Sequence, residues 1–238
     1  MYSFFSRIRY SECDAEGKLS LIGLLNYFQD CSTQQSEDLG IGVEVLHRRG
    51  ALWVVNSWQI DILRWPALGE KVEAVTIPYD IKGFFGKRNF CMKDENGEYL
   101  AKADSFWTYI SDKTGSPLRI PPDILNGYVI EEKLDMDYQG RKIDYPKDRA
   151  GAVKGKAVPV TEYLLDANHH VNNGKYVEIA TGFVREADNI DRLRVEYRKQ
   201  AFLGETMYPE TYDLGSRQVV KLSDSNDIPY TIVEFTKL

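Results

Sequence analysis

Two histidines stand side by side in a chain that has only three, within the segment "LLDANHHVNNGKYVEIA", Leu164 to Ala180. Asp166, Asn168 and His170 alternate along this segment, so in an extended loop their side chains project to one side. Near neutral pH a histidine can take a proton from water, and a nearby carboxylate or amide can fix its orientation. The residue types and their spacing therefore predict a site for general-base chemistry.

The amphipathic run after this loop predicts a helix that begins near Asn172. The loop would then end beside the unpaired backbone N–H groups and the positive dipole end of that helix. Such a position stabilises a developing oxyanion, which acyl transfer requires. Asp, Asn and His are also ordinary loop and capping residues, so a structural role stays open, and Asn172 or Asn173 is better explained as a cap.

Composition limits the classes of protein to which the chain can belong. It has 238 residues, 12% aromatic residues and a formal net charge of −6, which is typical of a folded globular protein. No basic run stands out, so a nucleic-acid role has no support. No window of about 18 apolar residues occurs, which predicts no membrane span, and the first residues do not resemble a signal peptide.

The three cysteines are odd in number and lack CxxC spacing: Cys13, Cys31 and Cys91. We interpret them as reduced thiols, not as a disulfide framework or a zinc site. The expectation is a cytoplasmic protein that uses no metal and no other cofactor.

An internal repeat indicates how the chain is organised. "DAEGKLS" (Asp14 to Ser20) matches "DANHHVN" (Asp166 to Asn172), and "PALGE" (Pro66 to Glu70) matches "AFLGE" (Ala201 to Glu205). The two matches occur in the same order in each half. They suggest that one structural unit has been duplicated.

Each copy predicts a strand, a polar loop, a helix and then antiparallel strands with period-two alternation. The predicted helices span 20–40 and 172–187, with Ser20 and Asn172 as N-caps. The predicted strands span 4–10, 52–65, 86–94 and 98–111 in the first copy, and 154–160, 192–202, 217–224 and 229–238 in the second.

This pattern predicts an α+β fold of two tandem hotdog domains, each a long helix wrapped by an antiparallel β-sheet. An ordinary α+β protein with separate layers is the alternative. We place the N-terminal domain at 1–130, a linker rich in proline and charge at 131–150, and the C-terminal domain at 151–238.

Several segments resemble the acyl-acyl carrier protein thioesterases. "DANHHVNNGKYVE" is similar to that family's D-x-N-x-H-V-N-N signature, and "VEYRKQA" (Val195 to Ala201) is similar to its L-E-Y-R-R-E-C segment. "LWVVNSWQIDILRWPALGEKV" and "FWTYISDKTGSPLRIP" resemble segments of its first domain. The resemblance implies a double hotdog that hydrolyses fatty acyl-acyl carrier protein to free fatty acid and carrier protein, which ends chain elongation.

The resemblance also implies catalytic roles for Asp166, Asn168 and His170. One departure concerns the family's Glu and Cys, which are replaced here by Gln200 and Ala201. A cysteine nucleophile at that position is therefore ruled out. Gln200 can hold a water through its amide but cannot accept a proton, so we expect it to position the water.

Two neighbouring residues receive weaker assignments. His169 occupies the variable position of the family's signature, and we expect it to be exposed. Glu196 could replace the missing base, although a bulge in its strand would turn it away from residue 200.

The first copy lacks this chemistry, because Glu16 and Lys18 stand where Asn168 and His170 stand in the second. We expect the N-terminal half to supply a pocket for the acyl chain instead. The residues assigned to this pocket are apolar and belong to the first helix and first long strand: Leu21, Leu24, Leu25, Phe28, Trp53, Val55 and Trp58. The same residues could simply form the core.

Two other functions stay open. Hydrolysis of acyl-coenzyme A uses the same chemistry on the same phosphopantetheine arm, and a non-catalytic acyl-binding hotdog protein would explain the missing glutamate. A homodimer is compatible with either function.

Overall fold

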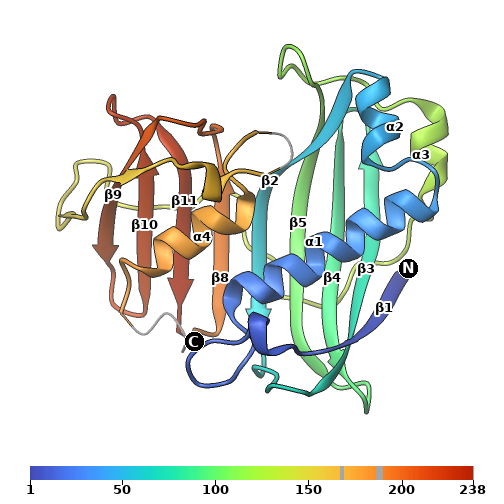
Figure 1. Ribbon diagram of the computed structural model, residues 1–238, viewed down its shortest axis with the longest axis horizontal. Coiled ribbons are helices and arrows are strands. Elements are labelled where there is room, and N and C mark those ends of the chain that lie inside the picture. Colours follow the sequence, from blue (N-terminus) through green and yellow to red (C-terminus); the bar gives the residue numbers. More distant parts are fainter. Residues whose placement is uncertain (167–168, 186–189, 238) are drawn as a thin grey trace. The chain divides into compact units, whose positions relative to one another are not determined.

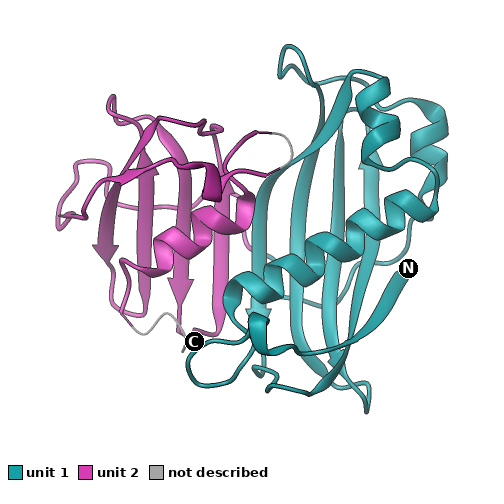
Figure 2. Cartoon of the chain, viewed as in Figure 1, with its two compact units in different colours: residues 1–138 teal, residues 139–238 magenta. Residues whose placement is uncertain are grey.

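The computed structural model describes residues 1–166, 169–185 and 190–237. The chain forms two compact units, Met1–Tyr138 and Gln139–Leu238 (Figure 2). In each unit a helix lies across one face of an antiparallel sheet (Figure 1). None of the helices in these described ranges is both long enough and apolar enough to cross a bilayer.

The first unit has the strand order β1-β3-β4-β5-β2, with antiparallel pairing throughout. Its strands are β1 (Tyr2–Arg7), β2 (Ala51–Ile62), β3 (Lys71–Lys82), β4 (Phe85–Asp94) and β5 (Tyr99–Ser111). Its helices are the short 3₁₀ turn η1 (Tyr10–Glu12), α1 (Leu21–Asp38), α2 (Val43–Arg48) and α3 (Pro122–Gly127).

Helix α1 begins where the sequence predicts, because the Ser20 hydroxyl accepts a hydrogen bond from the Gly23 N–H at 3.2 Å. Its apolar stripe is buried against the sheet, and Phe28 contacts both Trp58 of β2 and Phe90 of β4, with ring centroids 6.4 and 5.4 Å apart. Burying a side chain of this kind contributes roughly 1.5–3 kcal/mol, so these contacts fix the helix on the sheet.

The second unit repeats the plan on a smaller scale. Its main strand order is β8-β11-β10-β9, and the two short strands β6 and β7 both pair with β9. The elements are β6 (Val153–Lys154), β7 (Val158–Pro159), the 3₁₀ turn η2 (Glu162–Leu164), α4 (Asn173–Thr181), β8 (Arg192–Tyr197), β9 (Thr206–Asp213), β10 (Arg217–Ser223) and β11 (Pro229–Thr236).

The predicted second helix, 172–187, is too long. Helix α4 begins as predicted, with the Asn172 side chain accepting from the Gly174 N–H at 2.8 Å, but it ends at Thr181. Gly182 is the C-cap, and the Thr181 hydroxyl donates to the Glu178 carbonyl at 2.6 Å. A β-branched residue followed by glycine, Thr181 and Gly182, disfavours further helix, which explains why the predicted range extends too far.

The predicted linker residues 131–150 bind to the sheets. In the first unit, the Leu134 N–H and the Tyr138 hydroxyl both donate to the Asn89 side-chain oxygen at 3.0 Å. In the second unit, Ile143 is buried in a core cluster, and Arg149 pairs with Glu210 at 3.2 Å.

Candidate active site

The loop from Asp166 to His170 is closed by its own backbone. The Asp166 N–H donates to the His170 carbonyl at 2.8 Å, and the His169 N–H donates to the Asp166 carbonyl at 3.0 Å. An Asp166 carboxylate oxygen accepts from the His170 N–H at 3.5 Å. Asp166 thus holds the backbone that carries His170. Asn168, the predicted carbonyl-positioning residue, lies outside the described residues.

His169 turns the loop through the left-handed region, with φ of 61°, and its side chain is exposed, as predicted. In the first copy the equivalent position is Gly17, with φ of 73°. Glycine adopts this conformation without a steric cost, whereas histidine does not. His169 therefore serves the turn, and His170 stays the candidate base.

The loop is anchored on the segment that follows β8. The Val171 N–H donates to the Ala201 carbonyl at 3.1 Å, and His170 pairs with Phe202 in an antiparallel bridge. The Ala201 N–H donates in turn to the Tyr176 hydroxyl of α4 at 2.8 Å. Val171 and Ala201 are buried, so this side of the bridge belongs to the core.

The His170 imidazole lies on the other side and is half-buried. The Phe202 ring meets it edge to face, with centroids 4.9 Å apart and an interplanar angle of 81°. This contact limits the rotation of the imidazole. A partly shielded histidine held in one orientation suits proton transfer with a water.

Gln200 lies two residues before Phe202 of this bridge. Side chains alternate along extended chain, so extended backbone from Gln200 to Phe202 would place Gln200 on the same face as Phe202 and His170. The strand predicted over 192–202 ends earlier, at Tyr197, so Gln200 belongs to the connecting segment.

Glu196 is engaged elsewhere. Its carboxylate accepts from the Ile143 N–H at 3.1 Å and pairs with Arg198 at 2.9 Å. A carboxylate committed to an ion pair and a backbone donor is a poor general base. This geometry argues against Glu196 as a substitute for the family's glutamate.

The equivalent loop of the first unit has the same backbone hydrogen bonds. The Asp14 N–H donates to the Lys18 carbonyl at 2.8 Å, and an Asp14 carboxylate oxygen accepts from the Lys18 N–H at 3.0 Å. The Lys18 and Glu16 side chains form an exposed ion pair at 3.2 Å. The loop geometry confirms the repeat, while these side chains offer no histidine and no amide.

The second half of the repeat is confirmed in the same way. In "PALGE" the Glu70 carboxylate accepts from the Ala67 N–H at 2.9 Å, and in "AFLGE" the Glu205 carboxylate accepts from the Phe202 N–H at 2.9 Å. The glycine between them has positive φ in both copies. In the second unit this turn contains Phe202, which pairs with His170 of the predicted catalytic loop.

The residues predicted to line the acyl pocket gather on the helix-facing side of the first sheet. All except Trp53 are buried, namely Leu21, Leu24, Leu25, Phe28, Val55 and Trp58. Trp53 is half-buried and packs edge to face on Tyr109, with centroids 5.2 Å apart. We call these seven residues the apolar layer. Phe28 of α1 packs on Trp58 of β2, whereas Trp53 packs on an apolar cluster that includes Leu46 of α2 and Ile124 of α3.

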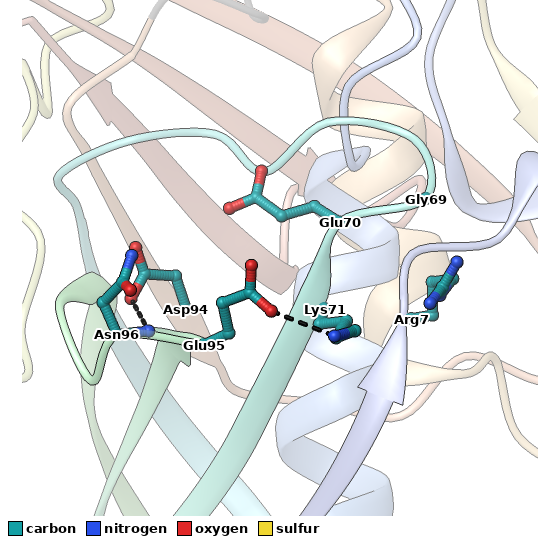
Figure 3. A pocket seen from close by; sticks show the side chains of 7 residues that line it. All are labelled: Arg7, Gly69, Glu70, Lys71, Asp94, Glu95 and Asn96. Carbon is teal, nitrogen blue, oxygen red and sulfur yellow. Dashed lines mark hydrogen bonds and ion pairs between the residues drawn. The ribbon is translucent and has the colours of Figure 1, made fainter.

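A polar pocket occurs at the edge of the first unit (Figure 3). Within this lining, Lys71 pairs with Glu95 at 3.1 Å. The Arg64 side chain holds Glu70 and lowers the pKa of that carboxyl. None of the predicted site residues lines it. The lining residues are Arg7, Gly69, Glu70, Lys71, Asp94, Glu95 and Asn96.

Sequence reasoning missed two residues that position the site. Phe202 fixes the His170 ring, and the Tyr176 hydroxyl holds the backbone next to Gln200. Phe202 lies in the repeated "AFLGE" turn, and this repeat is the sequence feature that could have pointed to Phe202. Tyr176 lies within the predicted helix 172–187, and no sequence pattern indicates the contact of its hydroxyl with the Ala201 N–H.

Two of the three cysteines are excluded as nucleophiles by their burial. Cys31 and Cys91 are buried in the first unit, and burial raises the pKa of their thiols to about 12 and about 11. A thiol with such a pKa is not ionised near neutral pH.

The arrangement of helix and antiparallel sheet defines a hotdog-like α+β fold. Two solved structures share this fold over nearly their whole length. An acyl-ACP thioesterase from Bacteroides thetaiotaomicron has a TM-score of 0.88 at 19% identity, covering 98% of this chain and 96% of that one. A putative oleoyl thioesterase from Lactobacillus plantarum has a TM-score of 0.84 at 23% identity, covering 100% and 96%.

The sequence itself identifies the family. The acyl-ACP thioesterase N-terminal domain family matches residues 2–128, so the chain belongs to the acyl-ACP thioesterase family. A chloroplastic acyl-[acyl-carrier-protein] hydrolase of Cuphea viscosissima is 25% identical over 207 residues, which cover 81% of this chain and 50% of that protein. The chain thus spans about half the length of the plant relatives it matches.

Proposed function

We propose that the protein hydrolyses the thioester of fatty acyl-acyl carrier protein to release free fatty acid and carrier protein. Family membership supports the class of reaction. The observation that carries the proposal is the His170 loop, which is closed by Asp166 and anchored beside Gln200. Relatives named as acyl-[acyl-carrier-protein] hydrolases support the carrier protein as partner.

In this mechanism His170 takes a proton from a water that Gln200 positions. The water oxygen attacks the thioester carbonyl, the carbon–sulfur bond breaks, and the thiol leaves with a proton returned from the imidazolium. Asn168 and the N-terminal end of α4 would stabilise the developing oxyanion. Asp166 acts through the loop backbone and keeps His170 in place.

We further propose a division of labour between two tandem hotdog domains, 1–130 and 151–238, joined by residues 131–150. The apolar layer under α1 would hold the acyl chain, and the second domain would supply the reactive groups. The Lys18–Glu16 pair supports this division, because it stands where the first domain would need a base. Buried, unpaired thiols fit a reducing compartment such as the cytoplasm.

Two alternatives share the fold. Acyl-coenzyme A presents the same phosphopantetheine arm and would meet the same loop. A non-catalytic acyl-binding protein would keep the apolar layer and lose the need for His170. A homodimer is compatible with all three.

A hydrolysis assay separates these functions. The full chain should be given acyl-acyl carrier protein and acyl-coenzyme A with identical acyl groups over a series of chain lengths. We expect a kcat/KM at least tenfold higher for the carrier protein substrates. Equal or higher values for coenzyme A would favour the second function, and binding without turnover on either substrate would favour the third.

A further inference from the structure

Arg88 is a buried cation in the core of the first unit. It lies on β4 with 8% of its surface exposed, and its guanidinium donates to the Gln35 side chain of α1 at 3.0 Å and to the Thr76 hydroxyl of β3 at 3.2 Å. Its guanidinium carbon stands 5.2 Å from the centre of the Tyr128 ring. All of these partners are neutral.

Within the described ranges, no carboxylate pairs with Arg88. Two other shielded cations do have a counter-charge: Arg194 pairs with Glu234 at 2.8 Å, and Lys221 pairs with Glu210 at 2.6 Å. A buried charge without a counter-charge is costly, and its burial lowers the pKa of Arg88. An unneutralised cation held this way fits a site that receives an acceptor from outside.

A second, independent observation points the same way. Trp58 has 2% of its surface exposed, and its indole N–H has no hydrogen-bond acceptor, as is also true of Trp53. A buried indole N–H normally finds a partner. The sheet register puts Arg88 opposite Ser105, and Ser105 opposite Trp58, so the two donors lie in one row beneath α1.

The neighbouring Ser105 hydroxyl does not provide an acceptor for these N–H donors. The Ser105 hydroxyl donates to the Arg88 carbonyl at 3.1 Å and accepts from the Trp107 indole at 2.7 Å. The Ser105 hydroxyl therefore already donates one hydrogen bond and accepts another. The row between α1 and the sheet holds surplus N–H groups and one uncompensated positive charge.

We infer that the acyl layer selects acyl chains bearing an acceptor oxygen, a hydroxyl, oxo or carboxylate group, with Arg88 as the specificity-determining residue. This inference rests on the proposed function, because it assigns a substrate class to the same layer. A plain hydrocarbon chain leaves the donors unpaired, whereas an oxygen on the chain pairs them. Rejection of an analogue that leaves buried donors unmatched is stronger than rejection by a missing methylene.

The test compares acyl chains of one length with and without the oxygen. Dodecanoyl-acyl carrier protein is compared with its counterparts that carry a hydroxyl or a carboxylate at the terminal carbon, and a hydroxyl or oxo group at the β-carbon. We expect at least one oxygen-bearing chain to have a kcat/KM about tenfold or more above dodecanoyl, the size of one charge-assisted hydrogen bond. The preferred chain identifies where the oxygen meets Arg88.

The variant Arg88→Met should abolish that preference and keep hydrolysis of dodecanoyl at or above the wild-type value. Because an apolar residue replaces an unpaired buried ion, the midpoint of thermal unfolding should not fall. If removal of Arg88 leaves Gln35 unsatisfied and the variant unfolds, the double variant Gln35→Leu/Arg88→Met removes both polar groups together. Arg119→Met makes the same change at an exposed arginine and should alter neither quantity.

Quenching of tryptophan fluorescence by decane and by 1-decanol repeats the comparison without turnover, because the first chain carries no oxygen and the second carries a terminal hydroxyl. Tighter binding of 1-decanol, lost in Arg88→Met, upholds the inference even if no thioester is hydrolysed, in which case only the proposed function fails. Equal kcat/KM values and equal binding affinities for plain and oxygen-bearing chains would contradict the inference. An Arg88→Met variant that loses thermal stability while the order of its substrates stays unchanged would show that Arg88 only holds the fold.

Discussion

Gln200 stands where the acyl-ACP thioesterases that the sequence resembles carry a glutamate, two residues before the Phe202 that pairs with His170. An amide can hold a water but cannot accept its proton. We therefore expect Gln200→Ala to lower kcat about tenfold, because the water is less well placed, and Gln200→Glu to retain or raise the rate. Steady-state kinetics check both. A Gln200→Ala variant with the wild-type rate would remove Gln200 from the site.

The backbone at His169 gives a second prediction at the level of single residues. Its φ of 61° is unfavourable for histidine, and the first copy has Gly17 at the equivalent position. His169→Gly should leave hydrolysis within about twofold of the wild-type rate and the free energy of unfolding within about 1 kcal/mol. Chemical denaturation measures the second quantity. A large loss of activity would mean that His169, not its neighbour, takes part in the reaction.

At the level of elements, Asp104 on β5 makes the stability of the first unit dependent on pH. Burial raises the pKa of this carboxyl to about 6, although the Tyr79 hydroxyl donates to it at 2.8 Å. The raised pKa means that the folded state binds the proton more tightly than the unfolded state. Stability from this group is present below about pH 4 and is lost as the pH rises through 6.

The variant Asp104→Asn removes this dependence, because the amide carries no charge and can still accept from Tyr79. We expect it to raise the free energy of unfolding at pH 7.5 by on the order of 1–3 kcal/mol and to have little effect at pH 4. Urea denaturation at the two pH values measures the difference. Asp112→Asn, an exposed change just after β5, serves as control. An equal effect at both pH values would contradict the assignment.

The elements predicted from sequence are those whose pattern matches their environment. The first long helix and the strands β2, β4, β5, β10 and β11 lie close to the predicted ranges, because period-two or helical spacing reports burial on one face. Strands β3 and β9 were not assigned. Each contains a proline, Pro78 and Pro209, which normally argues against a strand. Pro78 lies at a bulge of β3, where the ladder tolerates the missing N–H.

In the candidate site, too, local features could be predicted from the sequence and long-range contacts could not. The order of Asp166, His170 and the cap Asn172 is local, so the sequence could predict it. The contact of Phe202 with His170 depends on strand register and connects residues far apart in the chain, and no local pattern reports it. The unpaired charge of Arg88 was missed for a related reason, since its neighbours are Gln35 of α1, Thr76 of β3 and Tyr128, the residue that follows α3.

At the scale of the whole molecule, substitutions in the first unit should change which acyl chain is used without abolishing hydrolysis. Trp53 is the most suitable position, because it is only half-buried, whereas truncating Phe28 would cost about 3–5 kcal/mol of stability. Trp53→Leu should shift the preferred chain length toward longer chains, at roughly 0.8 kcal/mol for each methylene accommodated. A panel of acyl-acyl carrier protein substrates measures the profile.

The matched control for this division of labour is the exposed ion pair of Glu16 and Lys18 in the first unit. Glu16→Ala and Lys18→Ala should leave both the rate and the chain-length profile nearly unchanged, because the pair at 3.2 Å stands in solvent. A rate that collapses with Glu16→Ala would place chemistry in the first unit. A chain-length profile that stays fixed in Trp53→Leu would remove that residue from the acyl layer.

The central claim is that the His170 loop of the second unit carries out thioester hydrolysis, and one measurement tests it directly. Steady-state hydrolysis of acyl-acyl carrier protein is compared between the wild-type chain and His170→Ala, with the thermal unfolding midpoint of each recorded in the same buffer. We predict that kcat falls about a hundredfold or more while the midpoint stays unchanged, since the lost group is a base and its ring is only half-buried. A His170→Ala variant that folds and turns over at the wild-type rate would contradict the account.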